Sequence, residues 1–121
     1  MEKQILNLTQ HPATEEQKDA GVIEPKDKKK IQGLLTFERK PSIDEISERA
    51  DKLARIALMS GCKKAMIGGA PFLMPSLAFY IKRSGIQPVC AFSKRESVEK
   101  EVGGKIKKVS VFKHLGFTEA L

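Results

Sequence analysis

The fold class is decided by residues 65–71, Ala-Met-Ile-Gly-Gly-Ala-Pro, which join a short apolar run to a pair of glycines. A short apolar run bounded by a turn signal is typical of a buried strand, and glycines allow a tight turn after it. Leu73, Leu77, Tyr80 and Ile81 follow at helical spacing. The stretch therefore predicts a strand, a glycine turn and a helix, which is the repeating unit of an α/β protein.

Further strands and helices are expected around this unit. Ile5–Leu8 and Pro88–Phe92 are short and apolar, and polar residues follow each of them. Helices are expected after Thr14 and Ser42, which begin capping boxes of the form Thr-x-x-Gln and Ser-x-x-Glu. Another short helix is expected to start near Pro25, since proline suits the first turn of a helix.

The last third of the chain predicts an antiparallel hairpin. Gly103-Gly104 lies between segments rich in valine, and glycines tolerate the positive φ angles of a tight hairpin turn. The final strand is expected over about Lys105–Phe112, and Ser93–Ser97 is expected as a loop. Because helices separate the earlier strands, we predict one Rossmann-like three-layer α/β sandwich over residues 1–121. Its sheet would be mostly parallel, with a C-terminal antiparallel hairpin strand.

The charge of the chain favours an anionic partner. It has 22 Lys and Arg against 15 Asp and Glu, a formal net charge of +7. Phosphates, nucleic acids and anionic membranes are the usual partners of such proteins, although runs of lysine are also common as solvated surface. The excess comes mainly from two groups of lysines: Lys26, Lys28, Lys29 and Lys30, and then Lys105, Lys107, Lys108 and Lys113.

The remaining composition indicates a cytoplasmic protein without metal or cofactor. Cys62 and Cys90 are the only cysteines, and their apolar surroundings suggest buried free thiols of a reducing compartment. A CxxC pair or a Cys/His cluster of the zinc type is missing. Met1–Gln4 does not start an apolar leader, and no apolar run approaches the ~18 residues of a membrane span.

Candidate ligand-binding residues follow the predicted strands, because ligands of open α/β sheets bind at the carboxyl ends of parallel strands. Three groups are found there: Asn7, Thr9, Gln10 and His11 after the first strand, Gly68 and Gly69 after the second, and Ser93, Arg95 and Ser97 after the third. His114 follows the last strand. Because that strand runs in the opposite direction, the sequence leaves open whether His114 shares a site with His11.

The first two groups each have a chemical role and a structural alternative. His11 can act as a general acid or base, because imidazole titrates near neutral pH, or it is a loop histidine bonded to backbone. The amides of Gly68 and Gly69 can bind a phosphate before a helix, or the glycines only allow the turn. Thr9 and Gln10 can orient a ligand or simply end the strand.

The third group has the same two interpretations. Arg95 can clamp a phosphate, because its guanidinium is always charged and binds in a bidentate manner, with Ser93 and Ser97 as supporting donors. Alternatively it forms an exposed ion pair with Glu96, which contributes little. His114, like His11, is either a ligand-binding residue or a structural one.

Residues 5–17, Ile-Leu-Asn-Leu-Thr-Gln-His-Pro-Ala-Thr-Glu-Glu-Gln, combine a strand, a polar Thr/His loop and a Thr-x-x-Gln helix start. This stretch resembles the N-termini of the small CRISPR-associated Rossmann-like ring nucleases. The resemblance implies a homodimer that binds cyclic oligoadenylate and cleaves it without metal. Residues 65–71, 91–97 and 111–117 resemble a group of short bacterial and phage proteins, and that resemblance implies no activity.

The leading hypothesis is therefore a homodimer that binds a phosphate-bearing nucleotide, in particular a cyclic oligonucleotide second messenger. Whether it also cleaves the ligand, as a metal-independent hydrolase with His11 and Arg95 as catalytic residues, is left open. A second hypothesis is a non-catalytic protein that sequesters a ligand, or that binds nucleic acid or another partner. A third is an enzyme that acts on a small non-nucleotide anion.

Overall fold

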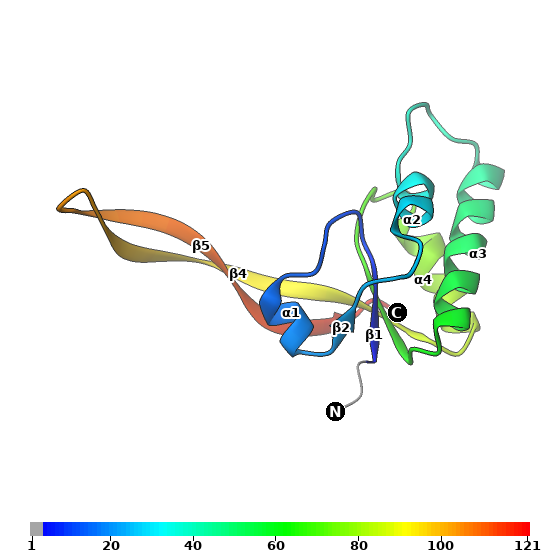
Figure 1. Cartoon of the computed structure of the whole chain (residues 1–121). Coiled ribbons are helices and arrows are strands. Elements are labelled where there is room, and N and C mark those ends of the chain that lie inside the picture. Colours follow the sequence, from blue (N-terminus) through cyan, green and yellow to red (C-terminus); the bar gives the residue numbers. More distant parts are fainter. Residues whose placement is uncertain (1–3) are drawn as a thin grey trace.

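The computed structural model describes residues 4–121 (Figure 1). Its elements are, in chain order, β1 (Ile5–Leu8), α1 (Glu15–Asp19), β2 (Val22–Ile23), α2 (Lys28–Leu35), α3 (Ile43–Ser60), β3 (Lys64–Ile67), α4 (Met74–Arg83), β4 (Gln87–Val102) and β5 (Lys105–Glu119). Met1, Glu2 and Lys3, on which the prediction about a leader partly rests, lie outside the described residues. Every helix within residues 4–121 is too short or too polar to cross a lipid bilayer.

The five strands form one sheet in the order β2-β1-β3-β4-β5. β2, β1, β3 and β4 pair in parallel, and β5 pairs antiparallel with β4. The predicted α/β fold, with a mostly parallel sheet and an antiparallel C-terminal strand, is confirmed. The sequence does not predict β2, because a strand of two residues is too short to show an alternating pattern.

Helices cover one face of this sheet more fully than the other. α2, α3 and α4 lie together beside the sheet in Figure 1, and the main core lies between them and one strand face, made by Leu6, Leu8, Ala65 and Ile67. The other face carries a smaller cluster with Ile5, Val22, Met66 and Val89. Ala13 packs there, but α1 buries none of its own residues. The three-layer Rossmann-like arrangement therefore stays a prediction.

The limits of α3 follow directly from the sequence. The Ser42 hydroxyl accepts the Glu45 N–H at 3.1 Å, and Gly61 ends the helix at a φ of 77°, which favours glycine. The buried residues of the helix, Ala50, Leu53, Ala54 and Ala57, form the expected apolar stripe. α2 starts later than expected, after an Asp27 cap rather than at Pro25.

β4 and β5 form a long hairpin that projects from the rest of the molecule (Figure 1). Gly103 and Gly104 make its turn with φ values of 59° and 79°, as the predicted hairpin requires. The predicted loop at Ser93–Ser97 is wrong, because these residues continue β4. The last strand also continues past Phe112 to Glu119. Residues 93–97 are all polar and mostly exposed, so no alternation of apolar and polar residues marks them as part of a strand.

Candidate functional site

The candidate site lies where the chain changes direction across the sheet. From β1 the chain passes through α1 to β2 on one side, and then through α2 and α3 to β3 on the other side of β1. Such a switch point leaves an opening at the carboxyl ends of the two central strands, and ligands of open α/β sheets bind there. In this sheet the opening is expected beside the ends of β1 and β3, at Leu8 and Ile67.

A crevice of about 550 Å³ occupies this position. Its walls come from the loop after β1, the turn after β3 and the adjoining part of β4. Five of the predicted site residues line it, namely Thr9, Gln10, His11, Gly68 and Gly69. The structure therefore brings together the candidate residues that follow the first and second predicted strands.

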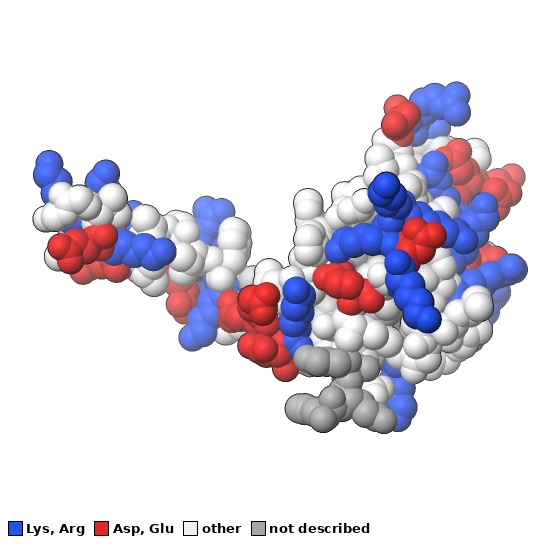
Figure 2. Space-filling model, viewed as in Figure 1, with Lys and Arg blue, Asp and Glu red and all other residues white. Residues whose placement is uncertain are grey.

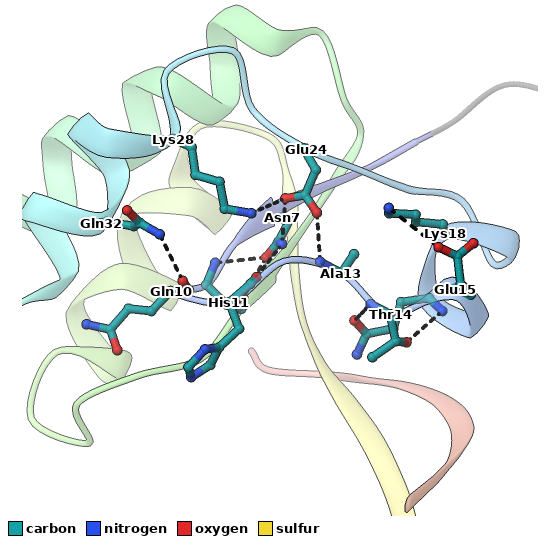
Figure 3. A network of polar contacts seen from close by, with 12 residues as sticks. Asn7, Gln10, His11, Ala13, Thr14, Glu15, Lys18, Glu24, Lys28 and Gln32 are labelled. Carbon is teal, nitrogen blue, oxygen red and sulfur yellow. Dashed lines mark hydrogen bonds and ion pairs between the residues drawn. The ribbon is translucent and has the colours of Figure 1, made fainter.

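Asn7 and Glu24 hold the loop that forms one wall (Figure 3). The Asn7 amide nitrogen Nδ2 donates to the His11 carbonyl at 2.8 Å and to Glu24 Oε1 at 2.9 Å. Its Oδ1 accepts the N–H and the hydroxyl of Thr9, at 3.0 and 2.6 Å. Asn7 is only 1% exposed, and these bonds use its whole hydrogen-bonding capacity. We therefore assign Asn7 to shaping the loop rather than to contacting a ligand.

Glu24 ties the same loop to β2 and α2. Its Oε2 accepts the Ala13 N–H at 2.7 Å, and its Oε1 accepts from the Lys28 ammonium at 2.8 Å. Partial burial raises the pKa of Glu24, but hydrogen bonds from Lys28, Ala13 and Asn7, with the charge of Lys28, outweigh it. The pKa of Glu24 therefore lies below its usual value, and the carboxylate is the charged centre of the network.

The side-chain donors of Thr9 and Gln10 form hydrogen bonds with other groups of the protein. The Thr9 hydroxyl, besides its bond to Asn7, lies 3.1 Å from the His11 carbonyl. Gln10 Nε2 donates to Thr36 Oγ1 at 3.0 Å and to the Leu35 carbonyl at 3.3 Å, at the end of α2. These donors fix the loop against α2, so they are not directed at a ligand.

His11 differs from its neighbours in the loop. Its imidazole is exposed and points away from the Asn7–Glu24 network (Figure 3). Among residues 4–121 the imidazole has no hydrogen-bond partner. Both ring nitrogens are therefore available to a molecule in the crevice, either as donor or as acceptor.

Gly68 and Gly69 form the facing wall. A Cβ on Gly68 would make an ordinary contact of 3.5 Å with the Thr9 methyl carbon, so the two loops lie next to each other here. Gly69 has a φ of 146°, which side-chain-bearing residues rarely adopt. The expected helix does not start here. A turn over residues 71–73 intervenes, and α4 begins at Met74 without a side-chain cap. The glycine amides therefore stand at the crevice without an adjoining helix end.

The hairpin candidates do not line the crevice. Their positions are Ser93, Arg95 and Ser97 in β4, and His114 in β5. The Arg95 guanidinium lies 5.1 Å from the ring centroid of Phe112, and the His114 ring packs at 4.9 Å against Phe117. Both His114 nitrogens are buried, and neither has a partner in the described part of the chain. Arg95 does not line this crevice, because β4 carries it outward along the hairpin, and its role as a phosphate clamp stays a prediction.

A larger open hollow, of about 730 Å³, lies between α2, α3 and the loop that joins them. Its central basic group is already engaged within the protein. The Arg49 guanidinium donates to the carbonyls of Gly33 and Thr36, at 3.2 and 2.6 Å, and pairs with Glu45 at 2.9 Å. The hollow is not at the strand ends, and Arg49 is one of three basic residues that line it, so we assign Arg49 a structural role.

Sequence reasoning missed several residues of the crevice and its support. Glu24 follows β2 directly, so it would have been found had β2 been recognised. Thr14 and Gln17 are expected only as a capping box, whose two bonds measure 3.0 and 3.1 Å, and both also line the crevice. Cys90, a half-buried free thiol, lines it as well, whereas the free thiol of Cys62 is buried elsewhere. Within residues 4–121, no three His, Cys, Asp or Glu side chains come together to suit a metal ion.

Comparison with known proteins places the chain in a family without adding an activity. No curated protein and no solved structure matches it. The resemblance of residues 5–17 to ring nucleases therefore stays a prediction. A family model does match, and it covers residues 3–118, almost the whole chain. The chain belongs to the family described as the Uncharacterized protein MJ1673 family.

Proposed function

We propose that the protein binds a phosphate-bearing nucleotide, in particular a cyclic oligonucleotide such as cyclic oligoadenylate, in the crevice between the ends of β1 and β3. The observation that carries the proposal is the meeting of the free His11 imidazole with Gly68 and Gly69 in one crevice at the switch point. Its volume of about 550 Å³ is within the usual range for small-molecule sites.

The chemistry of the walls suits an anion. Backbone N–H groups at a glycine turn can donate to phosphate oxygens, and glycine lets a ligand come close to the main chain. His11 adds a side chain that can donate to a phosphate or accept from a ribose hydroxyl. The net charge of +7 also favours the approach of an anionic ligand from solution.

Cleavage of the ligand requires catalytic groups in the site in addition to those that bind it. The ribose 2′-hydroxyl would attack the adjacent phosphorus in line, the bond to the 5′-oxygen would break, and that oxygen would leave with a proton. A base must take the hydroxyl proton and donors must stabilise the developing charge. His11 and Cys90 are the titratable residues among those that line the crevice in the described chain. Binding is therefore the better supported part of the proposal, and His11 is the residue to test for cleavage.

The resemblance of residues 5–17 to the ring nucleases also supports a proposal about fold, oligomeric state and location. We take the sheet to be Rossmann-like and the protein to act as a homodimer in the cytoplasm. Arg95 is no longer proposed as a residue of the site, because β4 carries it away from the crevice.

The experiment is thermal denaturation with a panel of cyclic and linear oligonucleotides in EDTA, with products read by chromatography. A ligand that binds the native state raises the melting temperature by mass action. We expect one cyclic ligand to raise it for the wild type by several degrees and to raise it less for His11→Ala. Product formed in EDTA by the wild type, and lost in His11→Ala, would add cleavage.

Two further variants make the result specific. Gly68→Ala should fold, since its Cβ meets only an ordinary 3.5 Å contact, and it should weaken binding by keeping the ligand off the main chain. Arg55→Ala is the control, because this arginine is 75% exposed on α3 and, among residues 4–121, pairs only with Asp51, at 3.0 Å. If no oligonucleotide shifts the melting temperature or gives a product, the proposal is wrong. The remaining hypotheses are then an interaction protein and an enzyme that acts on a non-nucleotide anion.

A further inference from the structure

The projecting hairpin has an unpaired edge. β4 pairs with β3 only over Gln87–Val89, and within residues 4–121 no strand pairs with that edge further out. An isolated two-stranded hairpin is marginally stable in water, and an unpaired edge is a template for another strand. The hairpin also exposes large apolar side chains, among them Phe92 at 57%, Ile106 at 72% and Phe112 at 67%. These features indicate a surface that is completed by a partner.

We propose that the partner is a second copy of this chain, whose β4 pairs antiparallel with β4 around a two-fold axis through Val98. The two hairpins would then form one four-stranded sheet in the order β5-β4-β4-β5. The inference rests on the hairpin alone and does not depend on the proposed ligand.

The charges along β4 select this register. With Val98 opposite its own copy, residues whose numbers sum to 196 face each other across the axis. Glu96 then lies opposite the partner's Lys100, and Arg95 lies opposite the partner's Glu101. Symmetry doubles each pair, so four complementary charge pairs form, and no like charges face each other.

Every neighbouring register of the two β4 strands places like charges opposite each other. In a symmetric antiparallel pair, the residue on the axis faces its own copy. An axis through Arg95, Glu96, Glu99, Lys100 or Glu101 therefore sets like charges directly opposite each other. An axis through Ser97 avoids this but places Lys94 opposite the partner's Lys100. Val98 is the one position in this stretch that leaves every charge unopposed or matched.

The β5 edge of the hairpin cannot form complementary charge pairs with its own copy. From Lys105 to Thr118, β5 contains four lysines and no acidic residue, so β5 cannot supply an opposite charge to its own copy. Basic and acidic side chains lie together along the hairpin in Figure 2, and the acidic ones, Glu96, Glu99 and Glu101, all come from β4. The charge distribution therefore points to β4 as the edge that meets a second copy.

The same register builds an apolar row. Val98 pairs with Val109 across the hairpin, so both side chains lie on the same face of the ribbon, and both are already half-buried. Around the axis, these two valines and their copies would lie side by side across four strands. Cross-strand pairs of β-branched residues stabilise sheets, and four strands with an apolar row are more stable than two.

The length of the hairpin also fits. In this register Gly103 of the partner subunit lies opposite Ser93, close to where the body of the molecule begins. The partner's turn therefore stops at Ser93, two residues short of Ala91, which lines the crevice, rather than colliding with the sheet. Each hairpin tip would then lie at the rim of the other copy's crevice.

The first test is the oligomeric state, measured by sedimentation equilibrium over a range of concentrations. We expect a dimer for the wild type and a dissociation constant raised at least about tenfold in Lys100→Glu, because Glu would then face the partner's Glu96. Within its own hairpin Lys100 lies opposite Lys107, so the substitution relieves a repulsion and does not weaken the ribbon. The double variant Glu96→Lys with Lys100→Glu restores complementary charges and should restore the dimer.

The second test locates the axis by disulfide formation in a Cys90→Ala background. Val98→Cys faces its own copy at a distance that suits a disulfide, so oxidation should give a covalent dimer. Val109→Cys is the matched control. It lies on the same face but three strand spacings of ~4.8 Å from its copy, beyond disulfide reach, and should stay monomeric on a non-reducing gel.

Three results would overturn the inference. One is a wild type that stays monomeric at every concentration, and another is a dimer that Lys100→Glu does not weaken. The third is equal cross-linking at positions 98 and 109. A monomer that binds duplex DNA with a steep salt dependence would instead assign the hairpin lysines to nucleic acid.

Discussion

The side-chain amide of Asn7 donates to the carboxylate of Glu24 across 2.9 Å and so joins the end of β1 to the end of β2. The same carboxylate accepts from Lys28 at the start of α2, so three elements meet at one charged group. This network fixes the loop that presents His11 to the crevice. The position of the candidate site therefore depends on Asn7 and Glu24 although neither is proposed to touch the ligand.

Substitution of Asn7 should destabilise the protein. Asn7→Ala would remove the four hydrogen bonds that Asn7 makes at a buried position, with the His11 carbonyl, with Glu24 and with the N–H and hydroxyl of Thr9, which costs about 2–4 kcal/mol of unfolding free energy. Urea denaturation measures the loss. The control is Glu15→Ala, whose side chain is 88% exposed and should change the unfolding free energy by less than about 0.5 kcal/mol. Equal effects of the two substitutions would contradict the role given to Asn7.

Glu24 should make the free energy of unfolding fall at acid pH. Its pKa is lower in the folded chain than the usual 4.5, so the unfolded chain binds the proton more readily. The stabilisation is complete above the unfolded pKa and is lost as the pH falls through the folded pKa. Glu24→Gln should cost about 2 kcal/mol at pH 7. The difference from the wild type should shrink at an acid pH below the usual pKa of 4.5. A constant difference across urea denaturation series at both pH values would contradict this.

Arg49 should stabilise the end of α2. Its guanidinium donates to the Gly33, Leu34 and Thr36 carbonyls and stacks 4.2 Å from the centroid of the Phe37 ring. Arg49→Ala is expected to cost about 1–3 kcal/mol.

Arg49→Lys should recover little, because an ammonium cannot match the fork of donors. The control for Arg49→Ala is Arg55→Ala on the same helix, where an exposed pair contributes less than about 1 kcal/mol. Amide hydrogen exchange of residues 36–42 should quicken in Arg49→Ala only. Unchanged exchange there would show that the guanidinium does not hold this loop.

The hairpin turn should tolerate only residues that accept positive φ. Gly104→Val places a β-branched residue at a φ of 79°, which costs about 1–2 kcal/mol. Hydrogen exchange should quicken across β4 and β5 beyond the body of the sheet while the helices keep their protection.

A glycine elsewhere provides the control for Gly104→Val. Gly33→Ala lies inside α2, where a Cβ would meet nothing within 4 Å, and it should be neutral or stabilising. If Gly104→Val left exchange in the hairpin unchanged, the turn would not be what holds the ribbon together.

The sequence predicts most of the fold from short-range signals. Thr14 and Ser42 start helices because their hydroxyls can accept backbone N–H groups, and Gly61 and Gly103-Gly104 end or reverse the chain because glycine accepts positive φ. Each signal depends on neighbours along the chain, so each can be recognised without knowledge of the packing. The polar loop before α1 and the glycine turn after β3 also fall in the crevice, as expected.

The features that the sequence could not predict depend on distant partners. β2 exists because Val22 and Ile23 pair with β1, and Glu24 matters because that pairing places it beside Asn7. Ser93–Ser97 reads as a loop because the residues are polar, yet pairing with β5 makes it a strand. That error moved Arg95 into the predicted site, when the structure places it on the hairpin.

The most direct test of the central claim is a titration of isotope-labelled protein with cyclic oligoadenylate in EDTA, followed by amide chemical shifts. Binding in the crevice predicts that the amides of Gln10, His11, Gly68 and Gly69 shift together and saturate, and that the same titration of His11→Ala is weaker. Shifts confined to the lysines of β5, or no shifts at all, would contradict the claim that this crevice binds a nucleotide.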